Sequence, residues 1–239
     1  SYSIVHGILE EGENPETVEK LILTASGGPF REIPFSRFST LTSRDALAHP
    51  TWNMGPKITV DSSTLMNKGF EIIEAHHLFH IPYSHIDVVI HPQSIIHSMV
   101  QFHDGAVMAQ CGIPDMEVPI QYALGETHRF EIKGRRLNLA EMGTLSFFNP
   151  DYKHFPCLKI AIDAGISGGI HPTVLNASNE IAVELFLTNK IYYDAISRIV
   201  EHTLNSIQNE QIQNLDQIEH IDSHARNLAY NYAINKEVR

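Results

Sequence analysis

Short apolar runs separated by polar turns mark the first half of the chain. The run at residues 20–24 predicts a buried strand, and the following Ser26-Gly27-Gly28-Pro29 predicts a turn. A second strand is expected at residues 57–60, before Asp61-Ser62-Ser63-Thr64, and a third at 86–91, where β-branched residues are frequent. Residues 94–102 and 106–110 flank Asp104-Gly105, a pair that favours a hairpin with a short turn.

Helical spacing of apolar positions dominates the rest of the chain. The pattern from Leu65 to Phe79 predicts a long amphipathic helix, and Asp61-Ser62-Ser63-Thr64 before it are good N-cap residues. Asn176 and Asn179 fall inside a later helix, where we expect them to form local hydrogen bonds. Further helices are expected at 43–48, 116–124, 158–164, 174–188, 195–206 and 221–234.

The order of these elements predicts the fold class. Strands mixed with helices indicate an α+β domain with a mixed sheet, and the last third of the chain indicates a small all-helical C-terminal bundle. Periodicity weakens between these parts, which is typical of a linker. The expected boundaries are therefore 1–126 for the first domain, 127–151 for the linker and 152–239 for the helical domain.

Composition excludes several classes of protein. The chain has 239 residues, 43% of them apolar, and 28 acidic against 17 basic residues give a formal net charge of −11. Nucleic-acid binding usually requires a basic balance, and we expect neither a nucleic-acid nor a membrane partner. An anion site must instead be made locally. The two cysteines lack the spacing of a metal site or a disulfide framework, which favours reduced thiols.

The densest group of reactive side chains lies at residues 61–71. A strand that passes into a helix with hydroxyls at its N-terminus would favour phosphate, and Lys68 would add a positive charge one turn later. Asn67 and Glu71 are four residues apart and should share a helix face, where the carboxylate could hold a divalent cation. The alternative is that the serines only cap the helix while Lys68 and Glu71 are solvated.

Other candidates are weaker when each is taken alone. Ser26 in its glycine-rich turn could approach an anion, or with His49 it could suggest a serine hydrolase, although the nucleophile elbow lacks its first glycine. Trp52, the only tryptophan, lies in a segment that is either a core anchor or a mobile lid. His91 and His97 are as well explained by buried, satisfied histidines as by catalysis. The G-x-G-x-x-G pattern of a dinucleotide site does not occur in the sequence.

The order of these motifs along the chain carries more information than any one of them. In sequence they are Ser26-Gly27-Gly28-Pro29-Phe30-Arg31, His49-Pro50-x-Trp52-x-Met54-Gly55, Asp61-Ser62, Met66-Asn67-Lys68-Gly69, Glu71, His91-Pro92-Gln93-Ser94, Pro114-Asp115-Met116 and Leu175-Asn176-Ala177-Ser178-Asn179-Glu180. This series resembles the 1-deoxy-D-xylulose 5-phosphate reductoisomerase family across the whole chain.

The resemblance implies an activity and its cofactors. Members of the family convert 1-deoxy-D-xylulose 5-phosphate to 2-C-methyl-D-erythritol 4-phosphate in non-mevalonate isoprenoid biosynthesis, and they use NADPH with Mg²⁺ or Mn²⁺. The first domain would then be the catalytic domain that binds substrate and metal. The family also implies a homodimer formed through the catalytic-domain sheet, and a location in the bacterial cytoplasm or, for some relatives, in plastids.

The resemblance also implies residue roles. Ser26, Ser62, Asn67 and Lys68 would bind the substrate phosphate, and Glu71 would be a catalytic and metal-binding carboxylate. His49, Trp52 and Met54 would belong to a lid over the site, with His49 in a catalytic role, Trp52 against the substrate and Met54 against the cofactor. Met116 would lie on the nicotinamide side, and His97 would lie close to the substrate as a further catalytic residue.

The chain departs from the family pattern at its front. Members carry an N-terminal nucleotide-binding domain and an Asp-Ser-Glu metal motif, and Ser1 falls near the expected place of that glutamate. We therefore expect this chain alone to be inactive in the reaction. The alternative is a non-enzymatic phosphate-binding or dimerisation module on the same fold, and a Ser26 hydrolase is a distant third hypothesis.

Overall fold

The computed structural model describes residues 15–47, 54–125, 129–134 and 136–235, and its contacts divide the chain into two compact units. Unit 1 comprises residues 1–27 and 74–150, and unit 2 comprises residues 28–73 and 151–239. Contacts thus group residues 28–73 with the C-terminal helices, whereas the boundaries expected from the sequence follow chain order. Those boundaries remain a prediction about domains. No helix among the described residues combines the length and apolar character needed to cross a bilayer.

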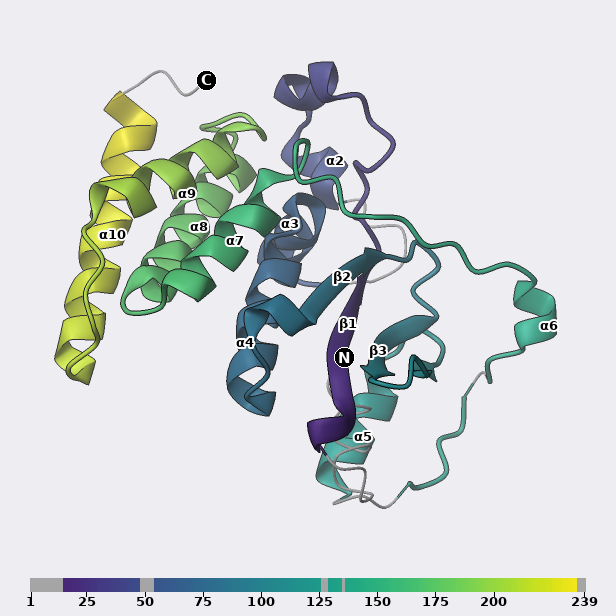
Figure 1. Ribbon diagram of the computed structural model, residues 1–239. Helices are drawn as coiled ribbons and strands as arrows, with labels where there is room; N and C mark the ends of the chain where they lie inside the picture. Colours follow the sequence, from purple (N-terminus) through teal and green to yellow (C-terminus); the bar gives the residue numbers. More distant parts are fainter. Residues whose placement is uncertain (1–14, 48–53, 126–128, 135, 236–239) are drawn as a thin grey trace. The chain divides into compact units, whose positions relative to one another are not determined.

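Unit 1 contains a mixed sheet, and the α+β fold class is confirmed. Within the described residues the strand order is β2-β1-β3-β4 (Figure 1). β1 pairs parallel with β2, where Leu23 lies opposite Val88, and antiparallel with β3, which continues into β4. The hairpin prediction is confirmed, and Gly105 has a φ of 87° in its turn. The strands are β1 (Val18–Ala25), β2 (Ile86–Ile90), β3 (Ile96–Phe102) and β4 (Val107–Cys111).

Burial in the sheet follows each strand's place in it. The second half of β1 is fully buried, whereas β2 and β3 alternate between buried and half-buried residues. β4 is at the edge of the sheet, and most of its residues are exposed, including Val107 and Met108. The remaining elements assigned to this unit are η1 (Pro15–Thr17), η3 (Tyr83–His85), α5 (Glu117–Leu124) and α6 (Leu139–Met142).

The segment expected as a linker is tied to the sheet. Ile90 and Phe148 exchange two backbone hydrogen bonds of 2.9 Å, which form an isolated antiparallel bridge. The Ile95 N–H donates to His91 Nε2 at 3.2 Å, which leaves Nδ1 to donate to the Ser146 carbonyl at 2.9 Å. His91 is fully buried, and this pattern fits a neutral ring with both nitrogens satisfied. His91 is therefore explained by structure.

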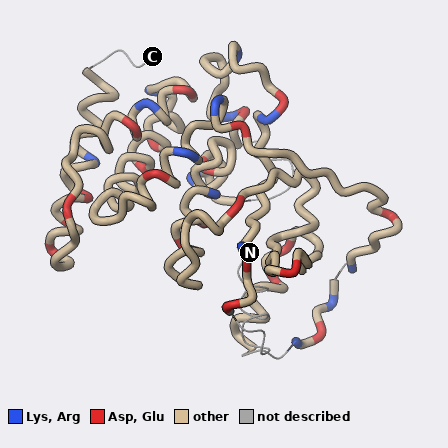
Figure 2. Tube along the Cα trace, in the orientation of Figure 1, with Lys and Arg blue, Asp and Glu red and all other residues tan. Residues whose placement is uncertain are grey.

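Unit 2 is built from helices. In the C-terminal part each helix expected from the sequence is present, and α8 packs most extensively against α9 and α10 (Figure 1). Lys and Arg are scattered along the trace among the more numerous Asp and Glu (Figure 2). The elements are η2 (Phe35–Thr40), α2 (Ser43–Leu47), α3 (Pro56–Thr64), the first part of α4 (Met66–Phe79), α7 (Pro156–Ser167), α8 (His171–Leu187), α9 (Ala195–Ser206) and α10 (Leu215–Asn235).

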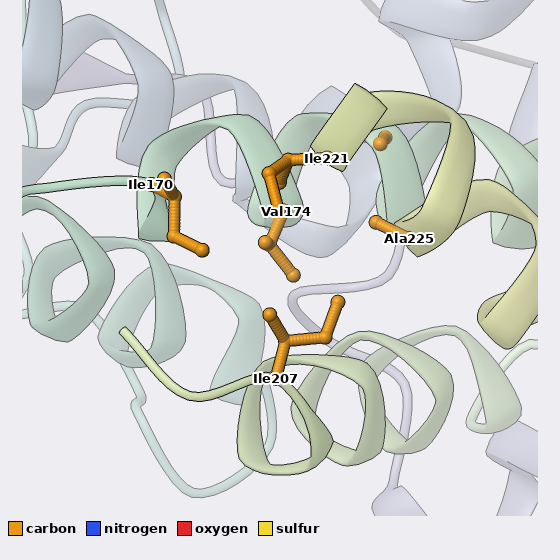
Figure 3. Close-up of a cluster of buried hydrophobic side chains, with 6 residues drawn as sticks. Ile170, Val174, Ile207, Ile221 and Ala225 are labelled. Atoms are coloured by element: carbon orange, nitrogen blue, oxygen red, sulfur yellow. The ribbon is translucent and has the colours of Figure 1, made fainter. Parts of the chain in front are cut away.

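One apolar cluster shows what holds the C-terminal helices together. Small and branched side chains from α8, α10 and the segments beside them meet in a buried core (Figure 3). Leu204 and Leu228 are partly buried and pack against this core. Burying a valine or isoleucine side chain stabilises a fold by about 1.5–3 kcal/mol. The cluster consists of Ile170, Val174, Ala177, Ile207, Ile221 and Ala225.

The strand expected at residues 57–60 is wrong, because these residues belong to helix α3. Pro56 occupies the first turn, where its fixed φ suits a helix, and the Thr59 hydroxyl donates to the Gly55 carbonyl at 2.8 Å. β-Branched residues are weak helix formers, but tertiary burial overrides such propensities. Thr59 and Val60 are buried here, and α3 packs against α7 and α8.

Candidate functional site

Asn67, Lys68 and Glu71 form a polar cluster on the first turns of α4. The Asn67 side chain donates to Glu71 Oε1 at 2.8 Å, and Lys68 Nζ donates to Glu71 Oε2 at 2.6 Å. The prediction that Asn67 and Glu71 share a helix face is therefore confirmed. Lys68 is only 7% exposed, so the carboxylate holds a nearly buried cation in one place. Such a pair can bind an anion through the lysine or a cation through the glutamate.

The hydroxyls before this cluster do not lie at a strand-to-helix junction as expected. Asp61-Ser62-Ser63-Thr64 form the last turn of α3, and Leu65, with a φ of 64°, turns the chain into α4. The Ser63 hydroxyl donates to the Val60 carbonyl at 2.6 Å within α3. Thr64 alone approaches the expected capping role, because the Met66 N–H donates to its Oγ1 at 3.3 Å. Ser62 is half-buried on this turn.

Gly28, the first residue of unit 2, lies directly against the end of α3. Gly28 has a φ of +69°, and a Cβ added to it would lie 2.9 Å from both the Ser62 carbonyl oxygen and Ser63 Cα. Only glycine avoids this clash and tolerates this conformation. Within unit 2 the Gly28 backbone therefore lies against the turn that carries Ser62, and this turn leads into α4. Ser26 follows β1 in unit 1.

Asp61 forms a second polar cluster, which sequence reasoning missed. Lys57 donates to Asp61 Oδ2 at 2.8 Å and Asn179 donates to Oδ1 at 2.8 Å. The expectation that Asn179 bonds locally is thus wrong, because its partner lies on α3, whereas Asn176 does bond locally to Glu180 at 3.4 Å. Burial raises the pKa of Asp61, and Lys57 and Asn179 oppose that rise. Motifs containing Asp61 and Asn179 were both visible in the sequence, but their pairing was not.

The other predicted site residues are dispersed in the chain. Met54 is half-buried just before α3 in unit 2, and Met116 is 56% exposed beside the start of α5 in unit 1. His97 is half-buried on β3, where burial lowers its pKa and backbone hydrogen bonds at Ile113 and Gly112 partly offset the effect. His49 and Trp52 lie outside the described residues.

Glu71 offers the kind of ligand that a divalent cation prefers. Carboxylate oxygens suit Mg²⁺ and Mn²⁺, and one carboxylate alone does not complete a coordination sphere. Within the described part of the chain, no three His, Cys, Asp or Glu side chains are grouped so that they could hold a metal ion. The donor type therefore fits, and further ligands would be needed.

Two family models match the chain in consecutive regions. Residues 2–79 match the model described as 1-deoxy-D-xylulose 5-phosphate reductoisomerase C-terminal domain, and residues 111–228 match the model described as DXP reductoisomerase C-terminal domain. A reductoisomerase of this name from Chloroherpeton thalassium is 51% identical over 222 residues, which is 93% of this chain and 57% of the relative. The chain thus spans little more than half the length of such relatives.

Solved structures give the same result for the fold. The reductoisomerase from Zymomonas mobilis in complex with NADPH aligns with a TM-score of 0.87 and 41% identity, over 95% of this chain and 59% of that one. A DOX-P reductoisomerase in complex with NADPH, fosmidomycin and magnesium aligns with a TM-score of 0.85 and 37% identity, over 98% of this chain and 58% of that one.

Proposed function

This chain belongs to the 1-deoxy-D-xylulose 5-phosphate reductoisomerase family, and we propose that it carries the substrate-phosphate site of such an enzyme. The proposed reaction converts 1-deoxy-D-xylulose 5-phosphate to 2-C-methyl-D-erythritol 4-phosphate with NADPH and a divalent metal, in non-mevalonate isoprenoid biosynthesis. One observation supports this assignment most directly: the nearly buried Lys68 and the amide of Asn67 lie on the first turn of α4, just after the turn of α3 that carries Ser62.

Phosphate binding follows from the chemistry of this segment. Lys68 would supply a full positive charge, and Asn67, Ser62 and Ser26 would supply neutral donors. The positive end of the α4 dipole would add to the attraction, because helix N-termini favour anions. In the proposed complex Lys68 turns from the Glu71 carboxylate toward the phosphate. Binding energy from this remote group would then position the reacting part of the substrate.

Glu71 would serve the metal side of the reaction. Its carboxylate is the one proposed metal ligand among the described residues, for Mg²⁺ or Mn²⁺. When bound, the cation would polarise the carbonyl and hydroxyl oxygens of the substrate. Before ligands bind, Glu71 would keep Asn67 and Lys68 oriented, because each of its oxygens accepts one of their hydrogen bonds.

The remaining roles stay proposals carried by the family. His49, Trp52 and Met54 would form a lid that excludes water, and Met116 would contact NADPH, the hydride donor. His97 would lie close to the substrate, and because burial lowers its pKa the ring would favour the neutral form there.

A homodimer and a location complete the proposal. Among the described strands β4 lies at the edge of the sheet and exposes the apolar Val107 and Met108, which supports pairing with a second copy through the sheet. For location we propose the bacterial cytoplasm, with plastids as the alternative that the family allows.

The test is a calorimetric titration of this chain with inorganic phosphate. Lys68→Ala should weaken phosphate binding at least about tenfold, because the nearly buried cation has no substitute on α4. Lys159→Ala is the matched control, since it removes an exposed lysine on α7 that is paired with Asp163 four residues later. Equal phosphate affinity in the Lys68→Ala variant and the wild type would remove Lys68 from the site.

Turnover separates the proposed enzyme from the two alternatives. In the complete gene product that carries this sequence, NADPH oxidation should depend on 1-deoxy-D-xylulose 5-phosphate and a divalent cation. Phosphate binding without such turnover would favour a non-enzymatic phosphate-binding or dimerisation module. A burst of ester or amide hydrolysis that disappears in Ser26→Ala would favour the hydrolase.

A further inference from the structure

A buried hydrogen bond ties α3 to the C-terminal helix α8. The Asn179 side chain donates to Asp61 Oδ1 at 2.8 Å across 118 residues of sequence. Asp61 is 1% exposed and Asn179 is 0% exposed. Burying a carboxylate and an amide costs free energy unless the two groups are paired. The buried surroundings of Asp61 and Asn179 therefore strongly favour this hydrogen bond.

The direction of each side chain is fixed by this pair. Lys57 occupies the other Asp61 oxygen at 2.8 Å, so both oxygens of the carboxylate are engaged. Asn179 Oδ1 has no hydrogen-bond partner among the described residues. Asp61, as the acceptor, therefore fixes the orientation of the Asn179 amide. In turn, the position of Asn179 on α8 fixes the position of Asp61.

A second hydrogen bond holds the same turn of α3 at Ser63, one residue after the proposed phosphate ligand Ser62. The Tyr193 hydroxyl donates to the Ser63 carbonyl at 2.7 Å. Tyr193 is 4% exposed, and its ring makes edge contacts with Phe30 at 4.9 Å and with Phe38 at 5.5 Å. Ser62 thus lies between two residues that are both anchored to the C-terminal helical part of unit 2.

From this arrangement we infer that Asp61 and Asn179 are positioning residues for the phosphate site. They fix the last turn of α3, and through Leu65 they fix the start of α4, so that Ser62 and Lys68 face one phosphate. The inference rests on the proposed function, and it gives the C-terminal helices a part in substrate affinity. Neither residue is assigned contact with the substrate.

Asn176, three residues before Asn179 on α8, is an asparagine that bonds within its own helix. Its side chain donates to Glu180 at 3.4 Å within the same helix. Glu180 in turn accepts from Arg226 on α10, which also bonds to Asp222. These contacts support the packing of α8 against α10 and include no hydrogen bond to Asp61, on which Glu180 acts through its charge, so they provide controls for the Asp61–Asn179 hydrogen bond.

The first experiment measures steady-state kinetics of the complete gene product with 1-deoxy-D-xylulose 5-phosphate. Asn179→Ala should raise KM about tenfold and change kcat less than about twofold, because a misplaced phosphate site loses binding shared by ground and transition states. Asn176→Ala should leave both parameters at the wild-type values. Arg226→Leu should lower the melting temperature without raising KM.

The second experiment reverses the pair. Asn179→Asp alone should raise KM, because it places two carboxylates against each other, whereas Asp61→Asn alone keeps an acceptor for the Asn179 amide. The double variant D61N/N179D restores a donor on α3 and an acceptor on α8, and its KM should return to within about twofold of wild type. Such rescue would show that KM follows the hydrogen bond between positions 61 and 179 rather than the identity of either residue.

The outcomes separate this inference from the proposed function. If Lys68→Ala leaves the affinity for phosphate unchanged, the proposed function fails. If Lys68→Ala weakens binding but folded Asn179→Ala keeps the wild-type KM, or loses only kcat, the positioning inference is overturned. Should Asn179→Ala not fold, the reversed pair decides: a wild-type KM supports the inference, and a tenfold higher KM in the folded double variant overturns it.

Discussion

The carboxylates of Asp61 on α3 and Glu71 on α4 have the same kinds of hydrogen-bond donor but differ in where those donors lie in the sequence. Each carboxylate accepts one hydrogen bond from a lysine and one from an asparagine. Lys68 and Asn67, which donate to Glu71, lie on its own helix, three and four residues away. For Asp61 the lysine is local, but the asparagine comes from α8.

This difference in origin separates a site that can rearrange from one that is fixed. Glu71 can release Asn67 and Lys68 to a ligand with small side-chain movements, because α4 stays intact. Asp61 cannot change partners without separating two buried helices. The separation in sequence between donor and acceptor, rather than the residue types, therefore distinguishes a binding cluster from a positioning cluster.

The largest expected effect is on turnover by the complete gene product. Glu71→Gln keeps the side chain's size and one acceptor but removes the charge, so turnover should fall at least about a hundredfold and respond weakly to Mg²⁺. Its urea-unfolding midpoint should match the wild type. Near-normal turnover in this variant would remove the metal role from Glu71 and break the comparison on the α4 side.

The second effect is on stability. Asp61→Ala leaves the Asn179 amide buried without an acceptor, and the free energy of unfolding should fall by about 2–3 kcal/mol. Glu71→Ala leaves the nearly buried Lys68 without its carboxylate, but it should cost less than Asp61→Ala, because the long lysine side chain can turn toward water without moving a helix. Urea unfolding of the two alanine variants measures both values. Equal losses would show that the two clusters do not differ as described.

The smallest effect is a pH dependence specific to Asp61. Burial raises its folded-state pKa above 3.8, so this carboxyl stabilises the fold below the unfolded pKa and loses that contribution as pH rises through the folded pKa. Asp61→Asn removes this loss, and its free energy of unfolding relative to wild type should therefore rise with pH across that window. Asp45 and Asp151, whose pKa values are lowered, have the opposite dependence but occur in both proteins.

Urea titrations of wild type and Asp61→Asn at several pH values above 3.8 provide the measurement. The difference between the two proteins cancels the titration of their common groups. A difference that is flat or falls with pH would mean that Asp61 is not desolvated in the way the structure indicates.

Local patterns predicted much of this molecule, and the reason is that their causes are local. The spacing of Asn67 and Glu71 sufficed to place them on one face, and the apolar periodicity of the last third of the chain predicted its helices. Asp104-Gly105 likewise marked the hairpin, because a positive φ at Gly105 is set by the turn itself.

The predictions failed where residues far apart in the sequence determine the local structure. The β-branched residues at 58–60 favour a strand on their own, and only packing against α7 and α8 makes the helix. The bond between Asn179 and Asp61 joins positions 118 residues apart, and no local pattern specifies it. The same applies to Tyr193 and Ser63, whose contact depends on how the helices of unit 2 assemble.

Leu65 is a buried residue in the left-handed conformation, and it alone separates α3 from α4. A non-glycine residue in that conformation is held at a cost of about 1–2 kcal/mol. Each residue of an α-helix also advances the direction of the next side chain by about 100°. Adding or removing one residue at this joint would therefore turn Lys68 away from the direction that Ser62 faces. The length of this connection is thus as much a determinant of phosphate recognition as the side chains on either side of it.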